Sequence, residues 1–341
     1  MAKLSQNISF YLRTLNSYIH YKSKRYIPFL VIINPTTLCN LNCKYCSSHN
    51  NNPHKMGIDN LFRIVDDVSR LGTASISISG GEPLLVKRIE EAGIYARKKK
   101  LRANLNTNGT LIDEKRAFRI ANSFDSVRIS LNGFEKTHDK ISGVKGTYKR
   151  VLKTLDYLTA APHRHAKIGI NFVLTQYNKH DASEFCRQFK DKVDFISFLP
   201  EFSFVQNQHQ KFSKPGLDIY ALAEQLNMKG KSGNTKQFIV NGKLDYTKKI
   251  CDAGKLYISI HPNGKIYACP FVSEENMSNY FLGSVYADGI ANSLKNVKKT
   301  YFSDGCIGCY ATCSTEISRI FRMQPYELIK NFQYLKKTYH I

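Results

Sequence analysis

Short hydrophobic runs alternate with amphipathic segments between residues 28 and 200. The runs have the length and residue types of buried strands, and the segments between them carry apolar residues at helical spacing. The predicted strands are 29–33, 74–79, 103–106, 126–131, 168–174 and 195–199. The predicted helices are 59–70, 89–99, 113–123, 148–158 and 180–189. Six strand–helix units with short connections predict an α/β fold, with helices outside a parallel sheet that curves into an open barrel.

The pattern changes after residue 200. Residues 201–250 lose the alternation around one predicted helix at 217–228, and a linker that carries a substrate lid is one interpretation of them. Two short strands, 257–260 and 265–268, follow and are joined through Asn263-Gly264, which is a strong hairpin signal.

Amphipathic helices are predicted at both ends of the sequence. In residues 1–27 the apolar positions recur at steps of four and three, and in residues 325–341 they lie on one helical side. These positions are Ile8, Leu12, Leu15 and Ile19 near the start, and Leu328, Ile329, Phe332 and Leu335 near the end. Basic residues accompany both, so each helix is expected either to pack on the protein's own body or to lie on an anionic membrane surface.

The composition favours a globular protein with a strongly basic surface. The 341 residues are 42% hydrophobic, and 50 basic against 27 acidic residues give a formal charge of +23. This charge points to a polyanionic partner, such as nucleic acid, an anionic membrane or an acidic substrate, or else to a solvated basic surface. No secretory signal is recognised, and the early apolar run at 29–33 is too short to cross a bilayer.

Eight of the nine cysteines fall in two groups, which favours metal ligation in a reducing compartment over scattered disulfides. A cytoplasmic location is therefore expected, with attachment to the inner membrane surface as an open alternative. Cys186 stands alone in a predicted helix and is interpreted as a buried apolar residue.

The first group is Cys39, Cys43 and Cys46, spaced C-x3-C-x2-C with Tyr45 before the last cysteine. Three thiolates on a cluster of four irons would leave one iron open for chemistry. A structural zinc site would need a fourth ligand, and His49 and His54 are the nearest candidates. Three buried core cysteines are disfavoured, because polar residues interrupt the segment.

The second group surrounds the predicted hairpin. Cys251 precedes it and Cys269 ends it, and Cys306, Cys309 and Cys313 follow in a C-x2-C-x3-C arrangement. Together they can supply four ligands to a second metal centre, either an iron–sulfur cluster or a zinc ribbon.

Polar loops follow several of the predicted strands. Gly80-Gly-Glu-Pro83, Asn106-Thr-Asn-Gly109 and Asn132-Gly133 all come at strand ends, as the first cysteine group does. The carboxyl ends of parallel strands meet at one face, so these loops are expected to form the active face together.

These motifs resemble those of radical S-adenosylmethionine (SAM) enzymes. The resemblance rests on the cysteine motif and Gly80–Pro83 and extends over roughly residues 29–200. It implies a partial (β/α)6 TIM-like barrel, a [4Fe–4S] cluster on Cys39, Cys43 and Cys46, bound SAM, and an external flavodoxin- or ferredoxin-like electron donor. The later cysteines resemble the SPASM and twitch extensions of that family. Five cysteines fit the twitch form with one auxiliary [4Fe–4S] cluster, and its spacing favours Cys313 as the residue that is not a ligand.

The resemblance also implies which residues bind SAM. These are Tyr45 near the adenine, Gly80, Gly81, Glu82 and Pro83 near the methionine amine, and Thr107, Asn108, Ser130 and Asn132 as hydrogen-bonding partners. Ordinary turn chemistry is the alternative for the last four. Two positions depart from the family pattern: Asn132 stands where relatives often carry aspartate, and Ser142 where many carry arginine.

The predicted organisation has four parts: a basic amphipathic helix (1–27), the barrel (28–235), an auxiliary-cluster domain built on a hairpin and helix (236–318) and a second basic amphipathic helix (319–341). The leading hypothesis is a radical SAM enzyme acting on an unidentified substrate, with a small-molecule or lipid-linked substrate favoured. A maturase of ribosomally made peptides is an alternative. A metal-stabilised module that binds nucleic acid is the alternative from another class and is less favoured.

Overall fold

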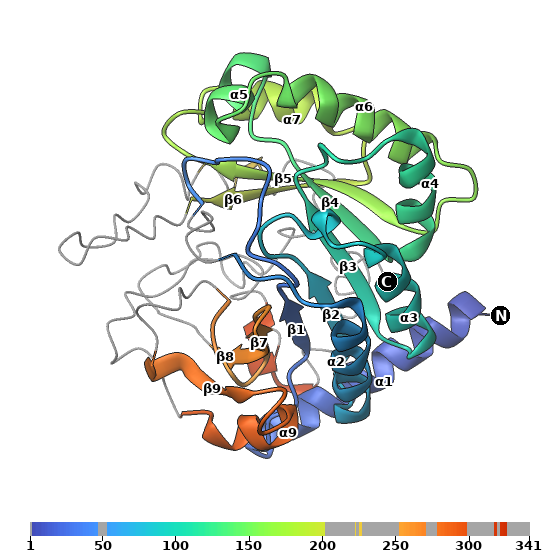
Figure 1. The fold of residues 1–341 in the computed structure, drawn as a ribbon, viewed down its shortest axis with the longest axis vertical. Coiled ribbons are helices and arrows are strands. Elements are labelled where there is room, and N and C mark those ends of the chain that lie inside the picture. Colours follow the sequence, from blue (N-terminus) through green and yellow to red (C-terminus); the bar gives the residue numbers. More distant parts are fainter. Residues whose placement is uncertain are drawn as a thin grey trace.

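The computed structural model describes residues 2–46, 53–201, 222, 225–226, 252–270, 278–298, 317–318 and 321–325. Its strands form one sheet of nine, in the order β6-β5-β4-β3-β2-β1-β7-β8-β9 (Figure 1). The parallel barrel strands are β1 (Leu30–Ile33), β2 (Ser75–Ile78), β3 (Arg102–Thr107), β4 (Ser126–Ser130), β5 (Lys167–Leu174) and β6 (Phe195–Pro200). Each pairs with its neighbour in sequence, and the sheet does not close on itself, which confirms the partial barrel.

Helices connect successive strands and cover the outside of the sheet (Figure 1). They are α2 (Ile58–Leu71), α3 (Ile89–Lys98), α4 (Glu114–Ser123), α5 (Glu135–Ser142), α6 (Thr147–Ala160) and α7 (Ala182–Phe189), preceded by α1 (Ala2–Lys22). None of the helices in the described part of the chain has the length and apolar composition that a bilayer crossing requires.

The predicted hairpin is present and extends the barrel sheet. Strand β7 (Tyr257–Ile260) pairs in parallel with β1, and β8 (Lys265–Tyr267) and β9 (Phe281–Ser284) then follow antiparallel. A short helix, α9 (Ile290–Ser293), comes after β9. The domain boundaries remain predictions. Most of the predicted C-terminal helix and most of 217–228 lie outside the described residues, although 222, 225, 226, 321, 322 and 325 are helical.

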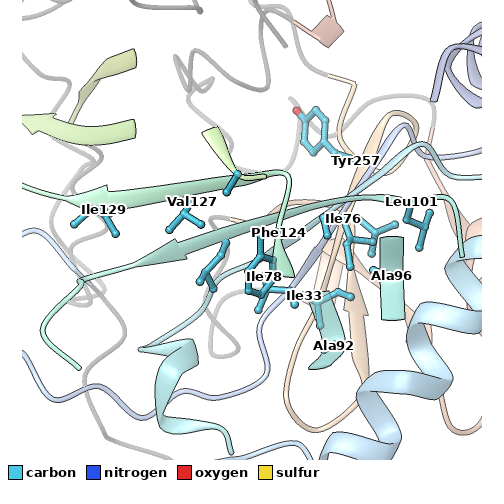
Figure 2. Packing of buried hydrophobic residues seen from close by; sticks show 14 of the residues in the cluster. Ile33, Ile76, Ile78, Ala92, Ala96, Leu101, Phe124, Val127, Ile129 and Tyr257 are labelled. Atoms are coloured by element: carbon cyan, nitrogen blue, oxygen red, sulfur yellow. The ribbon is translucent and has the colours of Figure 1, made fainter. Parts of the chain in front are cut away.

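Burial alternates along the strands, so the two faces of the sheet differ in polarity. In β3, Ala103 and Leu105 are fully buried, and the positions between them are half-buried and polar. Figure 2 shows the apolar side chains of β1, β2 and β4 packed with Ala92 and Ala96 of α3 and with Phe124. The sheet therefore has one apolar face under the helices and one more polar inner face.

The helix α5 and the strand β9 were not predicted. In Glu135–Ser142 the only large aliphatic residue is Ile141, so the segment lacks the apolar repeat that identifies a helix. Its other buried residues are His138 and Ser142. This helix nevertheless takes part in building the site.

Candidate active site

The segment 34–46, which carries Cys39, Cys43 and Cys46 and is called the cysteine loop below, follows the carboxyl end of β1. Hydrogen bonds to the backbone of His54 hold its first residues. The His54 carbonyl oxygen accepts hydrogen bonds from the Thr37 amide and the Thr36 hydroxyl, both at 3.0 Å. His54 thus contributes its backbone to the loop, and the other zinc candidate, His49, lies outside the described residues. In the described part of the chain, no three His, Cys, Asp or Glu side chains gather closely enough to hold a single metal ion.

The carboxyl end of α5 holds the middle of the loop. The Ser142 carbonyl accepts from the Asn42 amide at 3.0 Å, and the Ile141 carbonyl accepts from the Lys44 amide at 2.9 Å. Carbonyls in the last turn of a helix lack intrahelical partners, so the loop supplies the donors that α5 needs. The Ser142 and Thr147 hydroxyl oxygens are 2.8 Å apart and share a hydrogen bond.

The glycines after β2 press against the backbone that precedes Cys39. The Gly81 amide donates to the Thr36 carbonyl at 2.8 Å, and the Glu82 amide donates to the Leu38 carbonyl at 2.7 Å. A Cβ on Gly81 would lie 2.1 Å from the Leu38 oxygen, and Gly80 has a positive φ of 109°. Side chains at these two positions would therefore push the cysteine loop away.

Glu82 joins this loop to the end of β3. Its carboxylate is fully buried and accepts from the Leu84 amide at 3.0 Å, the Thr107 hydroxyl at 2.7 Å and the Asn108 amide at 2.7 Å. Burial raises the pKa of Glu82, and the three hydrogen bonds oppose that rise.

Asn132 joins the cysteine loop to β5. Its amide nitrogen Nδ2 donates to the Tyr45 hydroxyl at 3.0 Å, and its Oδ1 accepts from the Val173 amide at 2.8 Å. The Asn132 backbone amide donates to Nδ1 of His138 at 3.0 Å. An amide can donate and accept at once and an ionised carboxylate cannot, so the asparagine suits this bridge.

The three thiols lie in a partly buried cluster of like groups. Burial raises the pKa of Cys43 to about 12, and repulsion from Cys46 and Cys39 adds to the effect. Burial also raises the pKa of Cys39. Its sulfur accepts from the Leu41 amide at 3.4 Å and from Nδ2 of Asn108 at 3.9 Å. Three thiols on one loop, in the spacing C-x3-C-x2-C, are a donor set whose chemistry fits an iron–sulfur cluster.

Comparison with known proteins agrees with this geometry. Residues 33–189 match the family model of the radical SAM superfamily. The barrel of this chain is a radical SAM domain.

Two curated proteins are similar to this chain in sequence. Fe-coproporphyrin III synthase of Methanosarcina barkeri (strain Fusaro) is 32% identical over 156 residues, which are 45% of this chain and 38% of that protein. The sporulation killing factor maturation protein SkfB of Bacillus subtilis (strain 168) is 22% identical over 78% of this chain and 65% of its own length. The chain thus spans about two fifths of the first relative and about two thirds of the second.

A solved structure shows the same fold. The SAM-bound structure of SuiB from Streptococcus suis superposes with a TM-score of 0.66 at 20% identity, over 83% of this chain and 69% of that one. Together with the family match over residues 33–189, this likeness confirms the expected radical SAM fold.

The radical SAM domain brings most of the predicted site residues together. Asn108 reaches Cys39, Asn132 reaches Tyr45, and Glu82 reaches Thr107. Pro83 begins the short 3-10 helix Pro83–Leu85 that follows Glu82. Ser130 ends β4, half-buried, and no hydrogen bond among those recorded for the described residues joins it to the others. The roles of these residues toward SAM stay predictions.

The auxiliary cysteines are described only in part. Cys269 follows β8, is half-buried, and its carbonyl accepts from the Ser259 hydroxyl at 3.2 Å. Cys251, Cys306, Cys309 and Cys313 lie outside the described residues. Cys186 is buried in the core, as expected.

Two residues of the site escaped sequence reasoning. Asn40 accepts from Nδ2 of Asn108 at 2.8 Å and donates to the Thr110 hydroxyl at 2.8 Å, which ties the cysteine loop to the end of β3. His138 orients Asn132 from α5. The only signal in the sequence was the polar character of both segments, which does not identify a partner.

Half-buried polar side chains continue the site along the inner face of the barrel. The Asn106 amide donates to the Ser77 hydroxyl at 2.9 Å, and the Asn171 amide donates to Oδ1 of Asn106 at 3.4 Å. Asn104 and Arg128 are also half-buried, at alternate positions of β3 and β4. This face offers amide, hydroxyl and guanidinium groups below the cysteine loop.

Replacing Gly81 with alanine is expected to lower the free energy of unfolding by about 1–3 kcal/mol, because the new methyl group overlaps the Leu38 carbonyl. Urea denaturation measures this change, and iron content measures whether the displaced loop still holds a cluster. Gly57→Ala is the matched control, since no atom lies within 4 Å of its Cβ position. We expect the control to stay within about 1 kcal/mol of the native chain. An equal effect in both variants would contradict the steric account.

His138 should make stability dependent on pH. Its ring is 2% exposed, burial lowers its pKa from 6.5 to about 4, and its Nε2 has no hydrogen-bond partner among the described residues. Between these pKa values the unfolded chain binds the proton and the folded chain does not, so stability falls as the pH is lowered. From pH 7.5 to pH 5 the loss is about 2 kcal/mol. Urea denaturation at the two pH values should show a smaller loss in His138→Asn, and an unchanged pH dependence would refute this assignment.

Proposed function

We propose that the protein is a radical SAM enzyme whose Cys39, Cys43 and Cys46 hold a [4Fe–4S] cluster. A cluster held by these three residues would supply the electron for reductive cleavage of SAM to methionine and a 5′-deoxyadenosyl radical, which would take a hydrogen atom from the substrate. The observation that carries the proposal is the convergence of three strand-end loops on the cysteine loop within a radical SAM domain.

The protein's own residues shape this site in three ways. Glu82 fixes the glycine loop against β3 through three accepted hydrogen bonds. Asn108 donates toward the Cys39 sulfur, and such donors adjust the reduction potential of a cluster. Asn132 donates to the Tyr45 hydroxyl, and this hydrogen bond supports the proposal that a fixed Tyr45 ring lies near the adenine of SAM.

We infer a polar small molecule as the substrate. The amide, hydroxyl and guanidinium groups on the inner face of β2 to β5 support this class, because they match hydrogen-bonding groups better than an acyl chain. A peptide is the second candidate, favoured by one observation. SkfB, named a maturation protein, matches 78% of this chain, and the porphyrin synthase matches 45%.

Anaerobic reconstitution with iron and sulfide tests the proposal. Two clusters predict about eight irons per chain, and dithionite with SAM should then release 5′-deoxyadenosine. A substrate is recognised when its deuterium label appears in the 5′-deoxyadenosine. Tightly bound zinc without SAM cleavage would show the proposal to be wrong.

The electron donor is proposed to dock beside the cysteine loop. Lys44 lies between the ligands Cys43 and Cys46, and its Nζ is 5.4 Å from the ring centroid of Tyr177, as is Nζ of Lys140. The Tyr177 ring is 52% exposed, and neither lysine forms an ion pair among the described residues. Two cations around an exposed ring suit an acidic flavodoxin- or ferredoxin-like carrier.

Reversing both charges, Lys44→Glu with Lys140→Glu, is expected to slow cluster reduction by flavodoxin about tenfold at low salt. Stopped-flow absorbance follows the reduction, and dithionite should reduce the variant at the native rate. The control is Lys98→Glu, which reverses one charge at an exposed position on α3, away from the cysteine loop. Equal slowing by the control would exclude this docking position.

A further inference from the structure

Helix α1 turns a stripe of large aliphatic residues outward. Ile8, Leu12, Leu15 and Ile19 are 50%, 62%, 54% and 55% exposed. Steps of four, three and four residues place them on one side of the helix, in a line about 16 Å long at 1.5 Å per residue. The positions that predicted an amphipathic helix therefore do not face the protein's own core.

The opposite side of α1 is the side that packs on the barrel. Phe10 and Tyr18 are buried, Phe10 meets Phe29 edge-on at 5.9 Å, and Tyr18 meets Phe321 at 6.0 Å between ring centroids. The Arg13 guanidinium donates to the Ser69 and Thr73 carbonyls, both at 2.9 Å. These contacts fix the rotation of α1 about its axis, so the aliphatic stripe is held toward solvent.

The surroundings of the stripe are basic. Residues 1–27 contain no aspartate or glutamate. Lys22, Lys24 and Arg25 are exposed at one end, and exposed Lys100 reaches Ser5 at 3.2 Å near the other. Two copies that met through this face would bring like charges together in either orientation. An anionic bilayer supplies both the apolar layer and the negative charge that this face lacks.

The position of α1 sets the direction in which the active site faces. α1 contacts the residues that precede the strands: Thr73 before β2, Arg102 at the start of β3, and Asp125 before β4. It therefore crosses the amino ends of the strands, and the cysteine loop follows their carboxyl ends (Figure 1). The two features lie at opposite ends of the barrel.

We propose that α1 lies on an anionic membrane surface through Ile8, Leu12, Leu15 and Ile19 and holds the active face toward the aqueous phase. The direction of the active face rests on the proposed function, and the binding to membrane does not. A substrate taken from solution fits this arrangement, and a lipid-linked substrate lying in the same bilayer does not.

Co-sedimentation of the full chain with vesicles tests the binding. The native protein should pellet with phosphatidylcholine vesicles that contain phosphatidylglycerol, and less with pure phosphatidylcholine. Leu12→Ser with Leu15→Ser should weaken the partitioning about tenfold. Because both residues are exposed, the thermal midpoint of this variant should stay unchanged. The matched control is Phe118→Ser with Phe281→Ser, which are 48% and 43% exposed on α4 and β9.

The orientation can be measured by fluorescence, because the chain contains no tryptophan. Leu12→Trp should be quenched by brominated lipid, and Tyr177→Trp, beside the cysteine loop, should not. Comparing brominated with unbrominated vesicles cancels quenching by a bound cluster. Quenching at both positions would overturn the orientation.

Three results would overturn the binding. They are no pelleting of the native chain, equal loss in the control, or a dimer in sedimentation equilibrium that the Leu12 and Leu15 substitutions dissociate. Each is read without SAM cleavage, so failure of this proposal is distinct from failure of the proposed function.

Discussion

Cys43→Ala is expected to abolish the release of 5′-deoxyadenosine and to remove about four irons from each reconstituted chain. Cys43 is one of only three cysteines that the motif offers as ligands. A [4Fe–4S] cluster with two protein ligands would lose iron and its fixed open site. Iron and sulfide analysis, electron paramagnetic resonance and chromatography of the nucleoside measure the three consequences.

Cys186→Ala is the control for this variant. Cys186 is buried on α7 and belongs to neither cysteine group, so its loss should leave iron content and SAM cleavage near the native values. Cys186→Ala and Cys43→Ala each remove one thiol, so the comparison controls for the loss of a cysteine as such. If Cys43→Ala retained its iron while Cys186→Ala lost it, the assignment of ligands would be wrong.

Glu82→Leu is expected to destabilise the fold by about 4 kcal/mol or more and to suppress SAM cleavage. Leucine fills a similar volume but leaves three buried donors without an acceptor: the Leu84 amide, the Thr107 hydroxyl and the Asn108 amide. Each such donor costs about 1–3 kcal/mol when its partner is removed. Urea denaturation measures the first effect and nucleoside release the second.

Glu82→Gln separates hydrogen bonding from charge. Its carbonyl oxygen can still accept from Thr107 and Leu84, and its amino group would face the Asn108 amide as a second donor. We therefore expect a loss between those of the native chain and Glu82→Leu. If Gln and Leu were equally harmful, the two hydrogen bonds that Gln can retain would not account for the role of Glu82.

The strands and most helices were predictable because their apolar periodicity is regular. The edges of β1 to β6 fall within one residue of the predicted runs. By contrast, α5 was missed because the partners of its last turn are the loop amides of Asn42 and Lys44. These partners are distant in sequence and leave no periodic signal.

The sequence predicted which loops lie together at the site, but it did not predict the hydrogen bonds and contacts between them. The order of the strands placed Gly80–Pro83 and Asn132 beside the cysteines. The sequence could not show that Gly81 presses on the Leu38 carbonyl or that Asn132 bridges Tyr45 and Val173. These contacts depend on the twist and register of neighbouring strands, which the residue pattern alone does not specify.

The pairing of β7 with β1 has a consequence for biosynthesis. Leu30 lies opposite Tyr257, so the strand that leads into the cysteine loop gains its second neighbour only after roughly 230 further residues have been made. Until then one edge of β1 has unpaired backbone groups, a condition that favours misassembly during translation. The loop can reach its final geometry only after β7 has been made, so insertion of iron and sulfide should follow the synthesis of Tyr257–Ile260.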